Sequence, residues 1–215
     1  MTIVITGANR RIGAALLEGY AKAGREAIGT ARSPKGGLAP LDVTDPAAQK
    51  ALAKSLDGQP VELLICNAGV YLEKGQRFAT GYAPELWAQT FATNVTGVFL
   101  TIQALMPNLK LAEGAKIAII SSQMASDTKA SGGSYIYRAS KAAALNLGRN
   151  LATDLRKDGI AIGIYHPGWV KTDMGGAGAD IGTTEAAAGL IARFDALSLE
   201  TTGCFETWDG RAHPF

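Results

Sequence analysis

The sequence contains few cysteines, no long apolar run and almost no net charge. Of 215 residues only two are cysteines, Cys66 and Cys204, and their wide separation fits neither a disulfide framework nor a metal-ligand pattern. We therefore expect two reduced, buried thiols. Because the 21 basic side chains are nearly balanced by 19 acidic ones, the net charge of +2 gives no general attraction to nucleic acid or to anionic lipid.

Membrane and export signals are missing as well. Strictly apolar runs such as residues 117–120 are far shorter than the roughly 18–20 residues of a membrane helix. Residues 2–5 follow Met1 directly and are typical of a structural strand, which leaves no room for a basic leader peptide. The sequence thus predicts a cytoplasmic protein that binds no membrane. The two histidines, His166 and His213, have no partner at ligand spacing, so no metal site is expected.

Glycine and apolar side chains, in contrast, are plentiful. The chain has 26 glycines, about 12% of its residues against an average of about 7%, so many backbone positions need tight turns or close approach. With 47% hydrophobic and 19% charged residues, the chain can bury a sizeable core. Its length fits one domain, 1–215, because a second full core is not expected at this size.

Short β-type runs alternate with helical patterns along most of the chain. The strand candidates are residues 2–6, 26–30, 38–41, 61–66, 116–121, 160–165 and 203–207, and the helical patterns cover 12–23, 46–56, 91–107, 137–157 and 184–194. This alternation predicts an α/β fold: a single doubly wound (Rossmann) domain with a mainly parallel sheet of about seven strands. Only residues 33–37 separate the second and third strand candidates. Because that is too short for a crossover helix, we expect an irregular loop there.

Residues 6–13, Thr-Gly-Ala-Asn-Arg-Arg-Ile-Gly, form a glycine-containing turn between the first strand and the first helix. Gly7 would permit the tight turn and Gly13 the close packing of helix on sheet, while N–H groups at the helix N-terminus would bind a pyrophosphate. Taken alone, such a turn is often an ordinary connection. Its place as the first turn of the sheet favours a dinucleotide site, with Gly7, Asn9, Arg10, Arg11, Ile12 and Gly13 as the expected contacts.

The charges near the second strand indicate which dinucleotide would bind. An NAD site has an acidic residue there for the ribose 2′-hydroxyl, and residues 27–33 contain none. Arg32 stands there instead, with Arg10 and Arg11 available from the glycine-rich turn, and guanidinium groups suit a 2′-phosphate. For any single arginine a solvated surface position is the usual alternative. The three together predict NADP(H) as the preferred cofactor, with NAD(H) as the second choice.

Tyr137 and Lys141 lie four residues apart in a predicted helix, so their side chains share one face. At an effective dielectric constant near 20 and a separation of about 5 Å, an ammonium group stabilises a phenolate by roughly 3 kcal/mol, which would bring the tyrosine pKa from 10 to about 8. A phenol in that range exchanges protons with an alcohol or a carbonyl oxygen. Tyr135 has no such partner, because Ala139 occupies the matching position. The alternative for the pair is a surface role on the helix.

Further motifs follow in order along the chain. They are Asp42-Val43 after the third strand, Asn67-Ala68-Gly69 after the fourth, Asn94 in a helix, Ser121-Ser122 after the fifth, and the segment Pro167, Gly168, Trp169, Val170, Lys171, Thr172 after the sixth. With the glycine-rich turn and the pair Tyr137/Lys141, they resemble the short-chain dehydrogenase/reductase family over nearly the whole chain, in its TGxxxGxG, NAG, YxxxK and PGxVxT motifs. Residues 134–141, 166–174 and 208–210 resemble its C-factor-like, carbonyl-reductase-type branch.

The resemblance implies hydride transfer between a nicotinamide and a carbonyl or secondary alcohol, with proton transfer at Tyr137. Ser122 would hydrogen-bond the reacting oxygen, with Ser121 as the alternative. Lys141 would bind ribose hydroxyls and lower the Tyr137 pKa, and Asn94 would hold a water that relays protons. In isolation, Ser122 and Asn94 are more typical of structural roles. The cofactor contacts implied beyond the glycine-rich turn, Arg32 and the Tyr137/Lys141 pair are Asp42, Val43, Asn67, Ala68, Gly69, Pro167, Gly168, Val170 and Thr172.

Three positions depart from the family pattern. Arg11 replaces the middle glycine of the turn, residues 33–37 are shorter than the usual crossover, and Ser122 precedes Tyr137 by 15 residues, slightly more than usual. Residues 174–183 are rich in glycine where such enzymes carry a mobile substrate loop. Met124, Trp169 and Met174 would line an apolar substrate pocket, or belong to the core.

A small carbonyl or alcohol is the expected partner, and nucleic acid is not. A homodimer or homotetramer would form through the helices at 91–107 and 137–157, although a monomer would show the same pattern. The competing hypothesis is a cofactor-binding signalling or sensor protein with little turnover. The joint presence of Ser122, Tyr137 and Lys141 favours an enzyme. A nucleotide-sugar epimerase would need a larger substrate domain than this chain provides.

Overall fold

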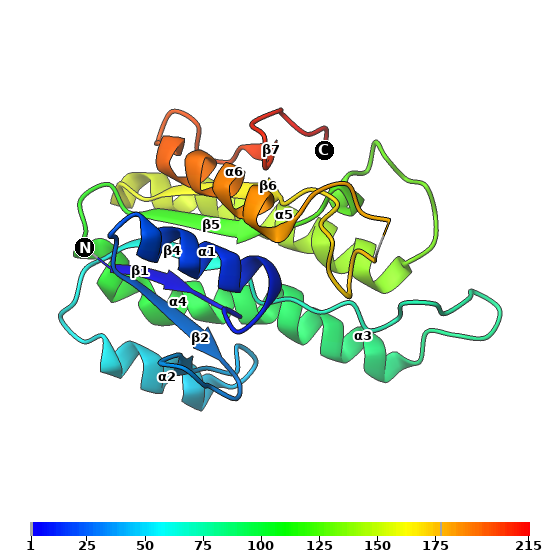
Figure 1. Ribbon diagram of the computed structural model, residues 1–215, viewed down its shortest axis with the longest axis horizontal. Coiled ribbons are helices and arrows are strands. Elements are labelled where there is room, and N and C mark those ends of the chain that lie inside the picture. The colour runs from blue at the N-terminus through cyan, green and yellow to red at the C-terminus, as the bar shows by residue number, and fades with distance from the viewer. Residues whose placement is uncertain (1, 177) are drawn as a thin grey trace.

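The computed structural model describes residues 2–176 and 178–215 and contains a single seven-stranded sheet (Figure 1). The strands are β1 (Thr2–Ile5), β2 (Ala27–Ala31), β3 (Ala39–Pro40), β4 (Val61–Cys66), β5 (Lys116–Ile120), β6 (Ala161–His166) and β7 (Phe205–Thr207). Their order is β3-β2-β1-β4-β5-β6-β7, and every neighbouring pair is parallel. The predicted doubly wound α/β domain is therefore confirmed, with all strands parallel.

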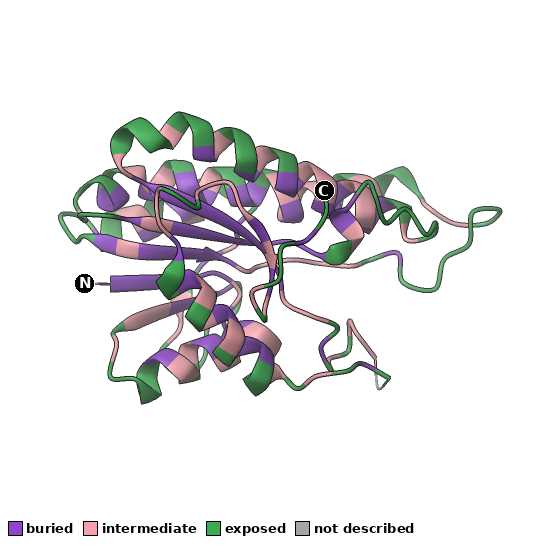
Figure 2. Cartoon of the chain, turned by 90° about the horizontal axis from the view of Figure 1, so that it is seen from above, coloured by how far each residue is buried: buried purple, intermediate pink, exposed green. Residues whose placement is uncertain are grey.

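Helices cover both faces of the sheet. They are α1 (Arg11–Lys22), α2 (Pro46–Ser55), α3 (Pro84–Phe91), α4 (Gly97–Lys110), α5 (Tyr135–Leu155) and α6 (Thr183–Ala196). One core joins the sheet to α1 and α6, through residues such as Leu16 and Leu190, and the other joins it to α2, α4 and α5. Figure 2 shows buried strands between helices whose outer sides are exposed. Among the described residues, no helix combines the length and the apolar character that crossing a membrane requires.

Neighbouring residues of the central strands serve opposite cores. Val4 packs with the α2, α4 and α5 side, whereas Ile3 and Ile5 pack with the α1 and α6 side; Leu63 and Leu64 divide in the same way. Because side chains alternate across a sheet, a strand covered on both faces must be apolar throughout. This requirement explains why the strands stand out as continuous apolar runs in the sequence.

The edge formed by β2 and β3 is short. Residues 32–38 join the two strands without a helix, as expected, and β3 pairs with β2 only at Thr30–Ala39 and Ala31–Pro40. The order in which strands are added across the sheet switches between β1 and β4. Strands β2 and β3 follow outward from β1 on one side, and β5 to β7 follow outward from β4 on the other. Ligands of open α/β sheets bind at the carboxyl ends of strands beside such a switch point.

The helix expected at 91–107 is longer than its apolar pattern indicates. It begins at Pro84 as α3 and passes through a π-helical turn, Ala92–Thr96, into α4. Of α3 only Thr90 is buried, and the apolar residues on the same face, Leu86, Trp87 and Phe91, are half-buried. The π-turn contains Asn94, which is buried. Such turns occur frequently at functional sites.

Candidate functional site

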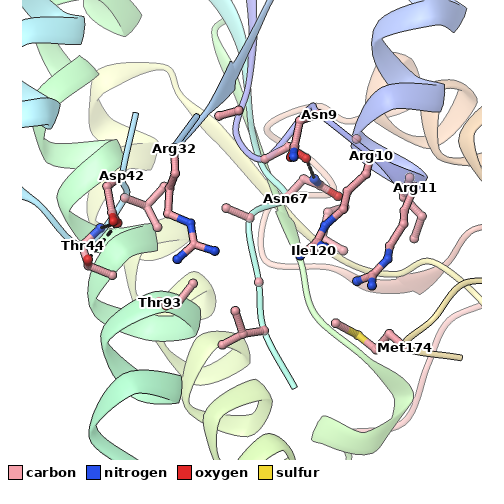
Figure 3. A pocket seen from close by; sticks show the side chains of 18 of the residues that line it. Asn9, Arg10, Arg11, Arg32, Asp42, Thr44, Asn67, Thr93, Ile120 and Met174 are labelled. Atoms are coloured by element: carbon pink, nitrogen blue, oxygen red, sulfur yellow. Dashed lines mark hydrogen bonds between the residues drawn. The ribbon is translucent and has the colours of Figure 1, made fainter. Parts of the chain in front are cut away.

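A cavity of about 560 Å³ lies at the carboxyl ends of the central strands (Figure 3). The sequence-predicted site residues that line it are Gly7, Asn9, Arg10, Arg11, Ile12, Gly13, Arg32, Asp42, Val43, Asn67, Ala68, Gly69, Tyr137, Lys141, Pro167 and Thr172. Asn94, Ser122, Gly168 and Val170 do not line it. The fold thus brings residues from five separate motifs to one cavity, within the size range of ligand pockets.

The glycine-rich turn is held from below by the motif after β4. The Asn67 side chain donates from Nδ2 to the carbonyl oxygens of Thr6 (2.9 Å) and Gly7 (3.1 Å). The Thr6 hydroxyl in turn accepts hydrogen bonds from the backbone N–H groups of Asn67 and Ala68, both at 3.0 Å. A Cβ on Gly13 would lie 2.6 Å from Asn67 Nδ2, so only glycine fits where helix and turn meet.

Arg11, where the family has a glycine, adopts a left-handed backbone with φ of 53°. Its guanidinium donates from Nη2 to Asp173 Oδ2 at 2.7 Å, across to the loop that follows β6. This contact lowers the pKa of Asp173, first through the hydrogen bond and then through the positive charge. Lys74 binds the same loop, donating to the carbonyl oxygens of Asp173 (2.8 Å) and Met174 (3.1 Å).

The three arginines expected at a 2′-phosphate are divided between two parts of the cavity. Figure 3 shows Arg32 beside Asp42 and Thr44, while Arg10 and Arg11 lie on the opposite side. The idea that all three converge is therefore wrong, because the turn directs Arg11 toward the loop after β6 instead. Within residues 2–176 and 178–215 the Arg32 guanidinium has no hydrogen-bonded or ion-paired partner.

Asp42 is fixed by the next turn of the chain. Its Oδ1 accepts hydrogen bonds from the backbone N–H and the hydroxyl of Thr44, at 2.9 and 2.8 Å. The backbone bond is the largest cause that lowers the pKa of Asp42, and the charge of Arg32 adds to it. A carboxylate held in this way lines the cavity at the end of β3.

Tyr137 and Lys141 meet in the interior, at exposures of 8% and 5%. The Lys141 ammonium lies 5.7 Å from the centre of the Tyr137 ring and donates to the carbonyl oxygen of Ile120 at 2.9 Å. Burial raises the pKa of Tyr137 to about 12, and burial lowers the pKa of Lys141 to about 8. The expected lowering of the Tyr137 pKa is thus wrong for this structure, because desolvation raises that pKa by more than the hydrogen bond with Ser122 lowers it.

The two serines after β5 have different partners. Ser121 donates its hydroxyl hydrogen to the backbone carbonyl of Lys141 at 3.0 Å. The Ser122 hydroxyl accepts from the backbone N–H of Met124 at 3.1 Å and also interacts with the Tyr137 phenol, whose pKa it lowers. Ser121 therefore supports the helix and lines the cavity, whereas Ser122 acts on the Tyr137 phenol.

Asn94 connects the motif after β4 to α5 from beneath the cavity. Its Oδ1 accepts from Val70 N at 2.8 Å, and its Nδ2 donates to Val70 O (2.9 Å) and to Ser140 Oγ (3.0 Å). A Cβ on Gly69 would lie 3.4 Å from both Asn94 Oδ1 and Lys141 Nζ, so Gly69 separates the two side chains. Asn94 positions the turn at 69–70 rather than facing the cavity.

Several lining residues were not singled out by the sequence. They are Ala31, Ser33, Leu41, Thr44, Val70, Leu72, Gln89, Ala92, Thr93 and Ile120; Ser121, the alternative to Ser122, lines the cavity as well. Tyr71, beside Leu72, packs its ring against that of Tyr137 with centroids 4.8 Å apart. Most of these residues flank a motif by one or two positions, which was the available signal. Of the apolar candidates, Met174 lines this cavity, and Trp169 lines a separate one with Gly168.

An all-parallel α/β sheet with a glycine-rich turn at its switch point and a buried tyrosine–lysine pair defines a nicotinamide-dependent oxidoreductase. The family model described as short chain dehydrogenase matches residues 1–180, and the chain belongs to this family. Members are NAD(P)-dependent enzymes that act on CH–OH or C=O groups.

Similar proteins extend over most of the chain. The C-signal protein of Myxococcus xanthus is 36% identical over 170 residues, which are 77% of this chain and 99% of that protein. The NADPH-bound carbonyl reductase from chicken fatty liver is 31% identical with a TM-score of 0.91, over 100% of this chain and 98% of that one. The carbonyl reductase Sniffer of D. melanogaster is 27% identical with a TM-score of 0.93, over 100% and 99%.

Proposed function

We propose that this enzyme is an NADP(H)-dependent reductase of a small carbonyl compound, working in reverse on the corresponding secondary alcohol. One observation carries the proposal: one cavity has the buried pair Tyr137 and Lys141 at one end and, at the other, the guanidinium of Arg32, which has no partner among the described residues. The chicken fatty liver carbonyl reductase, which is similar over its whole length, has NADPH bound. The likeness supports the same cofactor here.

The residues present fit a phosphorylated dinucleotide. Arg32 would bind the 2′-phosphate, and the backbone N–H groups at the start of α1 would bind the pyrophosphate, where a helix dipole favours negative charge. Asp42 and Val43 would contact the adenine, Lys141 the nicotinamide ribose, and Pro167, Gly168, Val170 and Thr172 would hold the nicotinamide. The glycine-only space at Gly13 is consistent with a turn that brings its backbone close to a ligand. When bound, the cofactor supplies the hydride.

The protein's own part is the proton. Because burial raises its pKa to about 12, Tyr137 keeps its proton at neutral pH and is suited to donate it to the oxygen of a carbonyl. Ser122 would hydrogen-bond the same oxygen and stabilise its negative charge. The Lys141 ammonium, now bonded to the Ile120 carbonyl, would turn to the ribose hydroxyls. Asn94 as the holder of a relay water remains a prediction.

We further propose that residues 174–183 form a mobile substrate loop; residue 177 lies outside the described residues. Its first residue, Met174, lines the cavity, and Lys74 and Arg11 hold the loop at 173–174. A homodimer or homotetramer through α4 and α5 is proposed as well, with Phe99 of α4 exposed to contact a second copy. Light scattering on the purified protein tests the assembly.

The decisive experiment compares the wild type with Tyr137→Phe and, as a matched control, Tyr135→Phe. Calorimetric titration with NADPH and NADH is followed by NADPH oxidation with a panel of aldehydes, ketones and quinones. We expect NADPH to bind all three proteins, and turnover to fall by about 10²–10⁴-fold only in Tyr137→Phe. Binding without turnover of any panel member by the wild type would instead support a cofactor-binding sensor.

A further inference from the structure

Helix α5, which carries Tyr137, starts without a cap from its own sequence. Ser134 stands at the N-cap position, with a left-handed backbone (φ of 50°) and no side-chain bond to a helix N–H group. Its hydroxyl instead lies 2.6 Å from the hydroxyl of Tyr71. The first N–H groups of a helix have no partner within the helix, so these donors need acceptors from elsewhere.

Glu73 supplies the missing acceptor from a distant loop. Its Oε1 accepts a hydrogen bond from the backbone N–H of Tyr137 at 2.6 Å, across a separation of 64 residues. Tyr137 is the third residue of α5, and a capping side chain ordinarily bonds the second or third N–H. Glu73 therefore does the work of a cap, at the helix end where the dipole favours negative charge.

The burial of Glu73 sets it apart from an ordinary surface cap. Its exposure is 1%, and its second oxygen, Oε2, has no hydrogen-bond partner within the described residues. Burying a carboxyl group with an unsatisfied oxygen is costly. A neutral capping residue, or one exposed to solvent, would avoid this desolvation cost. The burial of an acidic residue here therefore indicates a role at the site of Tyr137.

The same short segment holds the side chain of Tyr137 as well as its backbone. Tyr71 packs against the Tyr137 ring and hydrogen-bonds Ser134, the residue before α5. Residues 71–73 thus fix the first turn of α5 at three points: the Tyr137 N–H, the Tyr137 ring and Ser134. Glu73 does not line the cavity, so any effect on the reaction would pass through Tyr137.

We propose that Glu73 is a positioning residue for the reaction: its buried carboxyl group caps α5 at Tyr137 and holds the phenol in line with the reacting oxygen. The proposal rests on the proposed function of Tyr137 as the proton donor.

The charge of Glu73 supports the reductive direction. The groups that act on the Tyr137 phenol are Ser122 from the segment after β5, Tyr71 and Glu73 from the loop after β4, and Lys141 from α5. Burial is the main cause that raises the pKa of Tyr137, and the charge of Glu73 raises it further. Removing this charge lowers that pKa, so the loss of reductase activity on the alkaline side would move to lower pH.

Two conservative variants separate the hydrogen bond from the charge. Glu73→Gln keeps an acceptor oxygen at full reach but removes the charge, whereas Glu73→Asp keeps the charge and shortens the side chain. Glu113→Gln, at an exposed glutamate between α4 and β5, is the matched control. Glu73→Asp is expected to lower kcat by about 100-fold without changing NADPH affinity, because small misplacements of a reacting group have such effects. Glu73→Gln should retain more of kcat than Glu73→Asp and shift the alkaline limb of the pH profile to lower pH.

Hydrogen exchange at the Tyr137 amide tests the cap without any turnover. That amide has no partner inside α5, so its protection must come from Glu73, and Glu73→Asp is expected to exchange at least about tenfold faster than Glu113→Gln. If Glu73→Asp keeps the wild-type fold and exchanges fast, but the wild type itself reduces no carbonyl, the cap is upheld and the proposed function is rejected. Unchanged exchange, unchanged kcat in Glu73→Asp, or a loss of kcat matched by an equal loss of NADPH affinity would each overturn the positioning role.

Discussion

The guanidinium of Arg11 lies 2.7 Å from the carboxylate of Asp173, so the first residue of α1 is bonded to the loop that follows β6. This arrangement arises where the family has a glycine, and Arg11 keeps the left-handed backbone that suits a glycine. A side chain that bonds the loop after β6 thus stands where the family has no side chain. The left-handed backbone of Arg11 costs energy, and the ion pair with Asp173 offsets part of that cost.

Replacing Arg11 by glycine and by alanine separates these two effects. Both variants lose the ion pair, but alanine retains the cost of the left-handed backbone, so Arg11→Gly should be more stable than Arg11→Ala by about 1 kcal/mol in urea unfolding. At Lys50, inside α2, the order should reverse, because glycine is the poorer residue in a helix. An Arg11→Ala protein as stable as Arg11→Gly would show that the backbone at this position is not strained.

Cofactor preference is expected to depend on Arg32, since Arg11 is bonded to Asp173 instead. Arg32→Asp should weaken NADPH binding by about 10–100-fold, the loss of one charge-assisted contact, while NADH binding is retained. Lys54→Asp, on the exposed side of α2, makes the same change in net charge away from the cavity and is the control. Calorimetry gives both affinities, and an unchanged ratio in Arg32→Asp would reject the 2′-phosphate contact.

The fold could be read from the sequence because its strands are covered on both faces. Buried parallel strands such as β4 and β5 are apolar at nearly every position, and this pattern is local. Helix α3 was not predicted because its eight residues are too few for the apolar side chains of Leu86, Trp87 and Phe91 to establish a helical period. The extra residue of the π-turn around Asn94 has no local signature, since it depends on packing between α5 and the turn at 69–70.

The site could be predicted where each motif is contiguous, and not where distant segments meet. The residues of the glycine-rich turn and of 67–69 line the cavity as expected. Glu73 could not be linked to Tyr137, because 64 residues separate them and no periodic pattern connects them. The direction of the Tyr137 pKa shift could not be predicted either. The spacing to Lys141 reveals a nearby positive charge, but it does not reveal that the phenol is buried.

Lys141 should add to the stability of the cofactor-free protein as the pH rises, whereas Cys66, whose pKa burial raises to about 12, acts with the opposite sign in both wild type and variant. Lys141 titrates near pH 8 when folded and near 10.5 when unfolded, so between these values the unfolded chain binds the extra proton and the free energy of unfolding increases. Between about pH 7.5 and about pH 9.5, wild type should gain on the order of 2 kcal/mol relative to Lys141→Met in urea unfolding. Above pH 10, Tyr137 acts with the opposite sign, because its folded pKa lies above its unfolded one.

Lys50→Met, at an exposed lysine of α2, controls for the general loss of a positive charge. The difference in the free energy of unfolding between wild type and Lys50→Met should not depend on pH in the same range. A pH dependence that is equal in Lys141→Met and Lys50→Met would contradict the burial of a charged Lys141 as its cause.

Gly13 is expected to be the most sensitive glycine of the turn. A methyl group there would lie 2.6 Å from Asn67 Nδ2 and 3.0 Å from Ala8 Cα, so Gly13→Ala should cost about 1–3 kcal/mol in stability and abolish tight NADPH binding. Gly182→Ala is the control, because among the described residues no atom beyond the two chain neighbours lies within 4 Å of a Cβ at that position. Thermal unfolding and calorimetry on both variants check the prediction, and equal stabilities would contradict it.

Residues 71–74 contact two parts of the site at once. Tyr71 and Glu73 hold the start of α5, and the next residue, Lys74, holds the carbonyls of Asp173 and Met174. A movement that draws the loop after β6 outward would therefore pull on the segment that keeps the phenol in line. The same movement would then release the product and displace the Tyr137 phenol. Tyr137 would be positioned to donate its proton only while the loop after β6 stays in place.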